Sequence, residues 1–132
     1  MPFPEPLKKY PDLFKKRTVK GQRVTNRFPT LNIEEPPQFD PDTWTLAVEG
    51  LVKKPRVFSW EEFSALPTEE QVSDFHCITG WSKIDNNWQG VRLQTIAEIV
   101  KPLPEATFIT FSTADKGYYD WLTIEEAFYH DV

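Results

Sequence analysis

Alternating hydrophobic and polar positions predict the strands of this chain. Residues 44–48 read Trp-Thr-Leu-Ala-Val, and this period of two is typical of a half-buried strand. Runs rich in β-branched and aromatic residues also favour strands. On these patterns, further strands are predicted at 72–77, 88–93, 107–111 and 119–122. The predicted strands are therefore short and are spread over most of the chain after residue 43.

Two capping boxes predict where helices begin. Ser59 is followed three residues later by Glu62, and Thr123 is followed in the same way by Glu126. In this motif the first side chain accepts a hydrogen bond from the third helical N–H, and the Glu side chain reaches back to the cap. The first helix should end near residue 66, because Pro67 cannot continue it. The second helix begins only a few residues before the chain ends.

An apolar stripe predicts a third helix at 93–100. Its side chains at 93, 96, 97 and 100 share one helical face, and Pro102 ends the pattern. The polar segment 85–87, Asp-Asn-Asn, is interpreted as a turn before the strand at 88–93. Short strands mixed with short helices indicate an α+β fold.

The first 42 residues differ from the rest in composition. They contain eight of the prolines, which disfavour a long helix or a central strand, together with a cluster of Lys and Arg side chains. We interpret residues 1–42 as an extended arm and residues 43–132 as the folded domain. The arm is either simply solvated, or it wraps the body or contacts an anionic group.

Length and charge exclude several classes of protein. The chain has 132 residues, which suits one domain, and 14% of them are aromatic, which argues against global disorder. Its net charge of −5 argues against general nucleic-acid binding. No apolar run approaches the roughly 20 residues that span a bilayer. The first residues lack a secretory signal, so a cytoplasmic location is expected, or a periplasmic one if a signal was removed.

The single cysteine, Cys77, is the strongest candidate for chemistry. It stands at the end of a predicted strand, before a turn that contains Gly80. A lone buried cysteine is most often a small hydrophobic residue. A nucleophilic pair with His76 is a poor interpretation, because adjacent side chains in a strand point to opposite faces. From the residue alone, a buried structural role and a functional thiol both remain open.

The order of segments around Cys77 resembles a known family. The chain reads Val-Glu-Gly-Leu-Val at 48–52, Phe-Ser-Trp-Glu-Glu-Phe at 58–63, Phe-His-Cys-Ile-Thr-Gly-Trp-Ser at 75–82 and Trp-Gln-Gly-Val-Arg-Leu at 88–93. This order is similar to the molybdopterin-binding oxidoreductase domain of the sulfite oxidase family, and above all to its small bacterial members without a haem domain. The resemblance covers residues 25–132 and implies a mixed β-sheet with short helices.

The resemblance implies a cofactor and the residues that hold it. The position that matches the family's metal-binding cysteine is Cys77, whose thiolate would bind molybdenum beside the dithiolene of the pterin. A soft thiolate suits a redox-active metal. Trp81 matches an aromatic residue near the metal and would line the substrate entrance, so Cys77 and Trp81 are the expected catalytic residues. The expected pterin contacts are Asn26, Arg27, Pro29, Thr30 and Thr113.

The resemblance also implies oxygen-atom transfer, with an external electron-transfer protein. The substrate would be an oxyanion or an S- or N-oxide. Sulfite itself is not supported, because residues 73–76 lack the arginine that precedes the cysteine in sulfite oxidases. The family's downstream half finds no match, so the domain is expected to be incomplete at its C-terminus. The alternatives are a non-catalytic binding module that needs a completing chain or a second copy, and a thiol enzyme that uses Cys77.

Overall fold

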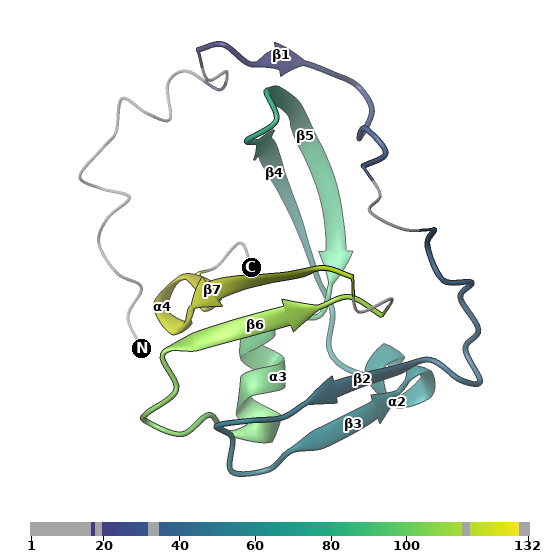
Figure 1. Cartoon of the computed structure of the whole chain (residues 1–132), viewed down its shortest axis with the longest axis vertical. Helices are drawn as coiled ribbons and strands as arrows, with labels where there is room; N and C mark the ends of the chain where they lie inside the picture. The colour runs from purple at the N-terminus through teal and green to yellow at the C-terminus, as the bar shows by residue number, and fades with distance from the viewer. Residues whose placement is uncertain (1–16, 18–19, 32–34, 115–116, 130–132) are drawn as a thin grey trace. The chain divides into compact units, whose positions relative to one another are not determined.

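The computed structural model describes residues 17, 20–31, 35–114 and 117–129, and these fall into two compact units. The first, here called the hairpin unit, combines the described residues up to Thr30 with Glu70–Gln89. The second, the core unit, combines the described residues between 31 and 69 with those between 90 and 129. Each unit is described below on its own (Figure 1).

The hairpin unit is built on a three-stranded sheet. Strand β4 (Glu69–Cys77) and strand β5 (Trp81–Gly90) are joined by the three residues 78–80, which is too short a connection for anything but an antiparallel hairpin. Strand β1 (Arg23–Val24) pairs with β5 in parallel, with Arg23 opposite Trp81. The N-terminal segment therefore lies along the edge of the hairpin, beside the turn that follows Cys77.

The predicted turn at 85–87 is wrong, because these residues lie within β5. Asp85 has a φ of 54°, in the left-handed region that strands avoid, and its N–H donates to the side chain of Asp74, at Oδ1 and 2.9 Å. Such a residue adds one position to a strand, as a β-bulge does. Asn86 is buried, and its side-chain amide donates to the carbonyl oxygens of Ser73 and Lys83. Polar composition indicated a turn, but buried side-chain hydrogen bonds stabilise a bulged strand.

The core unit contains two antiparallel strand pairs. Strand β2 (Thr45–Val48) pairs with β3 (Arg56–Ser59), and β6 (Phe108–Ser112) pairs with β7 (Tyr119–Thr123). Three of these strands match the predicted ranges within about one residue. Strand β3 was missed, since its four residues carry no clear alternation. The expected strand at 88–93 is confirmed only for residues 88–90, because β5 ends at Gly90.

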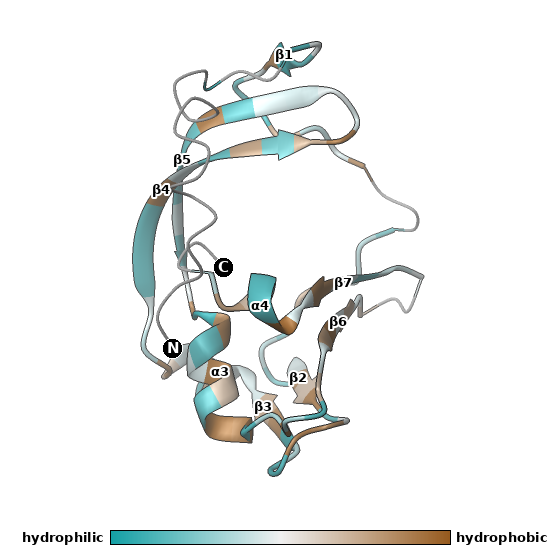
Figure 2. Ribbon diagram, turned by 90° about the vertical axis from the view of Figure 1, so that its left-hand side faces the viewer, coloured by the Kyte–Doolittle hydropathy of each residue, from teal (hydrophilic) through white to brown (hydrophobic). Residues whose placement is uncertain are grey.

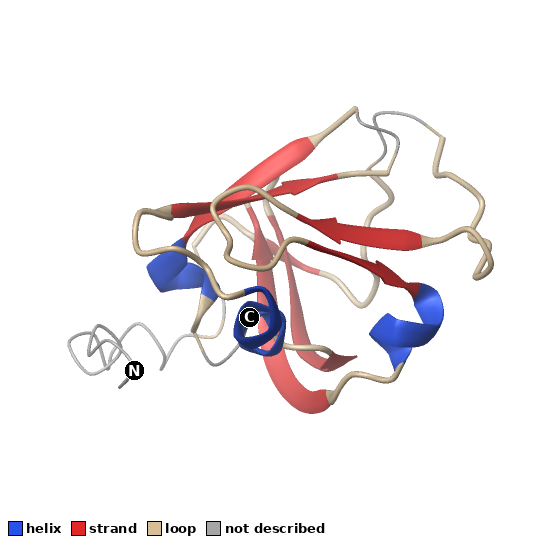
Figure 3. Cartoon of the chain, turned by 90° about the horizontal axis from the view of Figure 1, so that it is seen from below, coloured by secondary structure: helices blue, strands red, loops and turns tan. Residues whose placement is uncertain are grey.

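Both predicted capping boxes are confirmed. Helix α2 (Trp60–Ser64) begins after Ser59, whose Oγ accepts from Glu62 N at 3.2 Å while Glu62 Oε2 accepts from Ser59 N at 2.9 Å. Helix α4 (Ile124–Ala127) begins after Thr123 with the same reciprocal bonds to Glu126. Figure 3 shows these helices as short segments directly after strands. Helix α2 ends two residues before the predicted position.

The hydrophobic core lies in the core unit, between β3 and helix α3 (Leu93–Val100). Phe58, Ile96 and Val100 are buried there, with a surround of half-buried residues: Leu46, Val48, Val52, Phe63, Leu66, Val91 and Ile99. Figure 2 shows hydrophobic and hydrophilic residues alternating along α3, as an amphipathic helix requires. The α+β fold class is confirmed. None of the helices in the described part of the chain is long and apolar enough to cross a membrane.

Candidate functional site

Cys77 is the last residue of β4 and opens the hairpin turn. The N–H of Gly80 donates to the carbonyl oxygen of Cys77 at 3.0 Å, and Gly80 has a φ of 94°, a conformation that favours glycine. Ile78, the next residue after Cys77, is completely exposed. The Cys77 thiol is free and half-buried. The turn therefore presents the thiol at the end of a paired strand, where neighbouring backbone is held by hydrogen bonds.

The surroundings of the Cys77 thiol favour its ionised form. Thr79 Oγ1 lies 3.2 Å from Cys77 Sγ, and the backbone N–H groups of Thr79 and Ile78 also face the sulfur. These hydrogen bonds lower the pKa of the Cys77 thiol below its ordinary value, with the Thr79 hydroxyl making the largest contribution. A thiolate is the form of cysteine that binds metals. The turn therefore favours the form of cysteine that binds metals.

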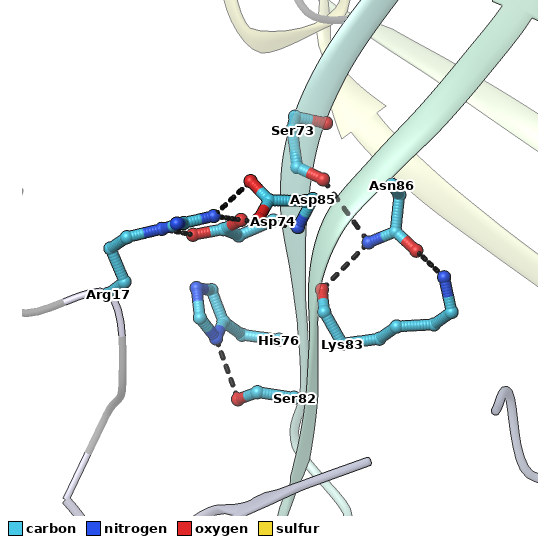
Figure 4. Close-up of polar contacts among 8 residues, drawn as sticks. All are labelled: Arg17, Ser73, Asp74, His76, Ser82, Lys83, Asp85 and Asn86. Atoms are coloured by element: carbon cyan, nitrogen blue, oxygen red, sulfur yellow. Dashed lines mark hydrogen bonds and ion pairs between the residues drawn. The ribbon is translucent and has the colours of Figure 1, made fainter. Parts of the chain in front are cut away.

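The two faces of the hairpin have different chemistry. His76 follows the strand alternation and bonds to Ser82, with His76 Nδ1 2.7 Å from Ser82 Oγ (Figure 4). Ser82 is completely buried. Figure 4 shows Lys83 and Asn86 on the opposite side of the hairpin from His76. This placement agrees with the argument against a Cys–His pair, because His76 makes its bond on the face away from Cys77.

The other face of the hairpin carries an aromatic cluster. Phe75 and Trp81 stack with ring centroids 5.5 Å apart, and Phe28 meets both of them edge-on at 5.7 Å. Trp88 lies 5.9 Å from Phe28 and 6.2 Å from Phe75. Trp81 and Trp88 are seven residues apart, so a regular strand would place them on opposite faces. Both nevertheless contact Phe28 and Phe75, and the left-handed backbone at Asp85, as in a β-bulge, accounts for the shared face.

An ion-pair cluster ties the N-terminal segment to the hairpin. Arg17 donates to both oxygens of the Asp74 carboxylate, at 2.8 and 3.0 Å, and also to Asp85 (Figure 4). With the Asp85 N–H, these contacts lower the pKa of Asp74 to about 2. Sequence reasoning missed this cluster. The sequence shows that the N-terminal segment is rich in Lys and Arg, but no local pattern identifies the acidic residues that pair with it.

Comparison with known families identifies this chain. Residues 33–132 match the family model described as the oxidoreductase molybdopterin binding domain. The chain belongs to this family. This is the family that the segments around Cys77 resemble. Its cofactor is molybdenum-molybdopterin.

Two curated relatives of this molybdopterin-binding domain carry oxidoreductase names. The chain is 39% identical over 111 residues to YuiH of Bacillus subtilis (strain 168), named an uncharacterized oxidoreductase; the match covers 83% of this chain and 56% of YuiH. It is 33% identical over 82 residues to MsrP of Campylobacter jejuni, named a protein-methionine-sulfoxide reductase catalytic subunit, over 61% of this chain and 27% of MsrP. The chain thus matches about half of the first relative's length and about a quarter of the second's.

Most of the predicted cofactor contacts lie in the same unit as Cys77. Thr25 N donates to Ser82 O at 2.9 Å, so the segment that follows β1 starts beside the hairpin. Phe28 then packs on the aromatic face. The predicted contacts within this segment are Asn26, Arg27, Pro29 and Thr30; Pro29 is half-buried and the other three are exposed. The hairpin unit therefore contains this segment together with Trp81 and Cys77.

Thr113 occupies a different place in the fold. It follows β6 in the core unit, where its N–H and its hydroxyl both donate to Tyr118 O at 3.0 Å. Its hydroxyl also accepts from Tyr118 N at 3.2 Å. These bonds close the connection between β6 and β7. A contact from Thr113 to the cofactor stays a prediction from the resemblance.

The donor set around Cys77 fits a cofactor that brings its own ligands. Among the described residues, no group of three or more His, Cys, Asp or Glu side chains could hold a metal ion. Cys77 supplies one soft sulfur donor, which suits a redox-active metal whose other ligands come from the cofactor itself. Trp81 adds a second feature: it is 7% exposed, and no described residue pairs with its buried indole N–H. The residues present therefore fit molybdenum-molybdopterin better than a bare metal ion.

Proposed function

We propose that this chain is part of an oxidoreductase in which Cys77 binds the molybdenum of molybdopterin. When bound, the cofactor supplies a redox-active metal able to transfer an oxygen atom and two electrons. The observation that carries the proposal is the position of Cys77: a lone thiol at the end of β4, with its ionised form favoured by Thr79 and by two backbone N–H groups. Family membership supports the same conclusion.

The chain's own residues would bind and orient the cofactor. Arg27 is exposed on the segment beside the hairpin, and a guanidinium is well suited to a phosphate group. Asn26 and Thr30 add neutral hydrogen-bonding groups, and Pro29 stiffens the segment. These residues precede residue 33, where the family match begins, so their role rests on the pairing of β1 with β5. Thr113 would contribute one further contact.

Trp81 would line the wall of the site and would not act as a proton donor or acceptor in the reaction. Its ring stacks on Phe75 and is packed against Phe28, which holds its orientation. A rigid aromatic wall excludes water and limits the shape of a substrate. The unpaired indole N–H of Trp81 is a donor that a bound group would satisfy.

Among the expected substrates, an S-oxide is favoured. MsrP is named a reductase of methionine sulfoxide in proteins, and residues 73–76 of this chain contain no arginine that would hold an oxyanion. In such a reaction the S–O bond breaks, the sulfur is reduced by two electrons, and two protons convert the released oxygen to water. An external electron-transfer protein must supply the electrons. The words "catalytic subunit" in the name of MsrP fit this arrangement.

The second candidate function is a binding module that pairs with another chain. The observation that favours it lies on one face of the β6–β7 pair. Phe108 and Trp121 are more than half exposed there, and Tyr119 is 71% exposed. Large aromatic residues on one strand face are typical of interaction surfaces. The two candidates differ in whether the chain takes up molybdenum.

Elemental analysis of molybdenum and zinc tests the proposed function. The full chain is produced in a host that makes the pterin, beside Cys77→Ser and the control Ile78→Ala, which alters the exposed neighbour of Cys77. We expect near-stoichiometric molybdenum in the unchanged chain and in Ile78→Ala, and its loss in Cys77→Ser with the far-UV circular dichroism preserved. Molybdenum retained by Cys77→Ser contradicts the assignment of the ligand. Folded protein without molybdenum favours the binding module.

A further inference from the structure

Gln22 connects the two strands that flank the Cys77 turn. Its side-chain Nε2 donates to the carbonyl oxygen of Cys77 at 2.9 Å. Its Oε1 accepts a hydrogen bond from the hydroxyl of Ser82. Cys77 is the last residue of β4 and Ser82 the second residue of β5, so one amide group bonds to both sides of the turn. Gln22 lies 55 residues before Cys77 in the sequence.

The backbone beside Gln22 reinforces this connection. Arg23 N donates to Gly80 O at 2.9 Å, and Thr25 N donates to Ser82 O at 2.9 Å. Gly80 N in turn donates to Cys77 O at 3.0 Å. The Cys77 carbonyl therefore accepts two hydrogen bonds, one from within the turn and one from Gln22. These contacts hold the backbone of Cys77 from two independent directions.

One of the two bonds of Gln22 ends on a fully buried group, the hydroxyl-bearing side chain of Ser82. Gln22 is half-buried, and Ser82 is completely buried between Gln22 and His76. Buried polar groups need their partners, because water is not available to replace them. A planar amide that bonds at both ends also has little rotational freedom. Gln22 is therefore a fixed part of the turn rather than a solvated side chain of the arm.

We propose that Gln22 is a positioning residue for Cys77: it holds the carbonyl of the ligand residue and thereby sets the direction in which the thiol points. The proposal rests on the proposed role of Cys77 as the metal ligand. Groups that orient a ligand without contacting the metal commonly change metal affinity by about 10- to 100-fold when they are removed. In this chain the orienting group comes from the N-terminal segment and acts on a turn far away in sequence.

Two variants separate the ends of the Gln22 amide. Gln22→Met keeps the length of the side chain and removes both hydrogen bonds. Gln22→Glu keeps the acceptor for Ser82 and removes the donor to the Cys77 carbonyl. The matched control is Gln89→Met, the same change at an exposed position near the other end of β5. Thermal unfolding of all three identifies any general loss of stability.

The first measurement is amide hydrogen exchange in the cofactor-free full chain. The reporter groups are the N–H of Gly80 and of Arg23, which are both hydrogen-bonded in the turn and its pairing. We expect Gln22→Met and Gln22→Glu to accelerate exchange at these groups by roughly 2- to 10-fold, the effect of losing one hydrogen bond. Gln89→Met should leave them unchanged. Equal exchange in Gln22→Met and the unchanged chain overturns the proposal.

The second measurement uses protein loaded with cofactor. We expect Gln22→Met to shift the thiolate-to-molybdenum charge-transfer absorption and to lower metal affinity by about 10-fold. A purely structural role would lower the unfolding temperature without moving this band, and that result also overturns the proposal. If the unchanged chain takes up no molybdenum, the proposed function fails. In that case, amide hydrogen exchange of the Gly80 N–H in Gln22→Met and in the unchanged chain still decides whether Gln22 holds the turn.

Discussion

The interactions that stabilise the hairpin unit internally differ from those that stabilise the core unit. In the core unit, the buried side chains Phe58, Ile96 and Val100 form an apolar cluster between a strand and an amphipathic helix. In the hairpin unit, the fully or nearly buried residues are Ser82, Asn86 and Trp81, and two of these are polar. The side chains of Ser82 and Asn86 bond to residues more distant in the sequence, Gln22 and Ser73, whereas Trp81 is packed against Phe28 and Phe75.

The difference teaches where stability and geometry come from. Apolar burial is non-directional and supplies most of the free energy of folding. Hydrogen bonds add less net free energy but require particular distances and angles. The core unit therefore suits a stable base, and the hairpin unit suits a site whose ligand must point in one direction. The candidate ligand Cys77 belongs to the unit built on directional contacts.

The largest effect is expected when the apolar cluster is broken. Phe58→Ala removes a side chain that is 1% exposed and should lower the free energy of unfolding of the core unit by about 3–5 kcal/mol. Denaturant unfolding measures the change, and hydrogen exchange in α3 and β4 locates it. The control is Val57→Ala, at the neighbouring position on the exposed face of β3, which should change stability by about 0.5 kcal/mol or less. Equal loosening of β4 would show that the two units unfold together.

A smaller effect, dependent on pH, is expected in the hairpin unit. The Asp74 carboxylate has an ordinary pKa of 3.8, and its contacts with Arg17 and the Asp85 N–H lower this to about 2 in the folded chain. Because the folded pKa is the lower one, the stabilisation is complete above about pH 4 and is lost as the pH falls through about 2. Asp74→Asn should therefore accelerate exchange of the Asp85 N–H at neutral pH.

The acid side of the same experiment sharpens the comparison. Near pH 1, below the folded pKa of Asp74, the unchanged chain and Asp74→Asn should become alike at the Asp85 N–H, since the carboxylate is then largely protonated. Asp42→Asn, the same change at an exposed position of the core unit, is the control and should not affect the hairpin at any pH. A difference between Asp74→Asn and the unchanged chain that persists without change down to about pH 1 would contradict the role of this charge.

The smallest effect concerns one hydroxyl group. Thr79→Val keeps the shape of the side chain and removes the hydrogen bond that contributes most to lowering the pKa of Cys77. We expect the pKa of Cys77 to rise toward its ordinary value of 9.0, so that less thiolate is present at neutral pH. The pH dependence of Cys77 alkylation by iodoacetamide, in the cofactor-free chain, measures this shift. Thr79→Ser retains the hydroxyl and should behave like the unchanged chain.

Local signals predicted the core unit well. The capping boxes at Ser59 and Thr123 depend on residues three positions apart, and both form as expected. The apolar stripe at 93–100 became α3, which ends at Val100; Lys101 follows in a left-handed conformation just before Pro102. Such signals are readable because each one involves neighbours in the sequence. Strand β3 was not predicted, because its residues carry no clear alternation and the strand forms through its pairing with β2.

The hairpin unit was harder to predict because its decisive contacts are not local. The polar run at 85–87 indicated a turn, and only the carboxylate of Asp74 and the buried amide of Asn86 explain why it is a bulged strand. Trp81 and Trp88 share a face for the same reason. Arg17 and Gln22 contact hairpin residues that are more than 50 positions away in the sequence. No hydrophobic periodicity or local motif in the sequence indicates such contacts.

The sequence by itself determined the α+β class, the capped helices, the amphipathic α3 and the candidacy of Cys77, which is the chain's single thiol. Those features follow from residue type and from spacing within a few positions. The tertiary structure alone decided that the N-terminal segment pairs with β5, that Gln22 holds the Cys77 carbonyl and that Arg17 meets Asp74. Hydrogen bonds and ion pairs need partners at defined distances, and folding alone brings those partners together.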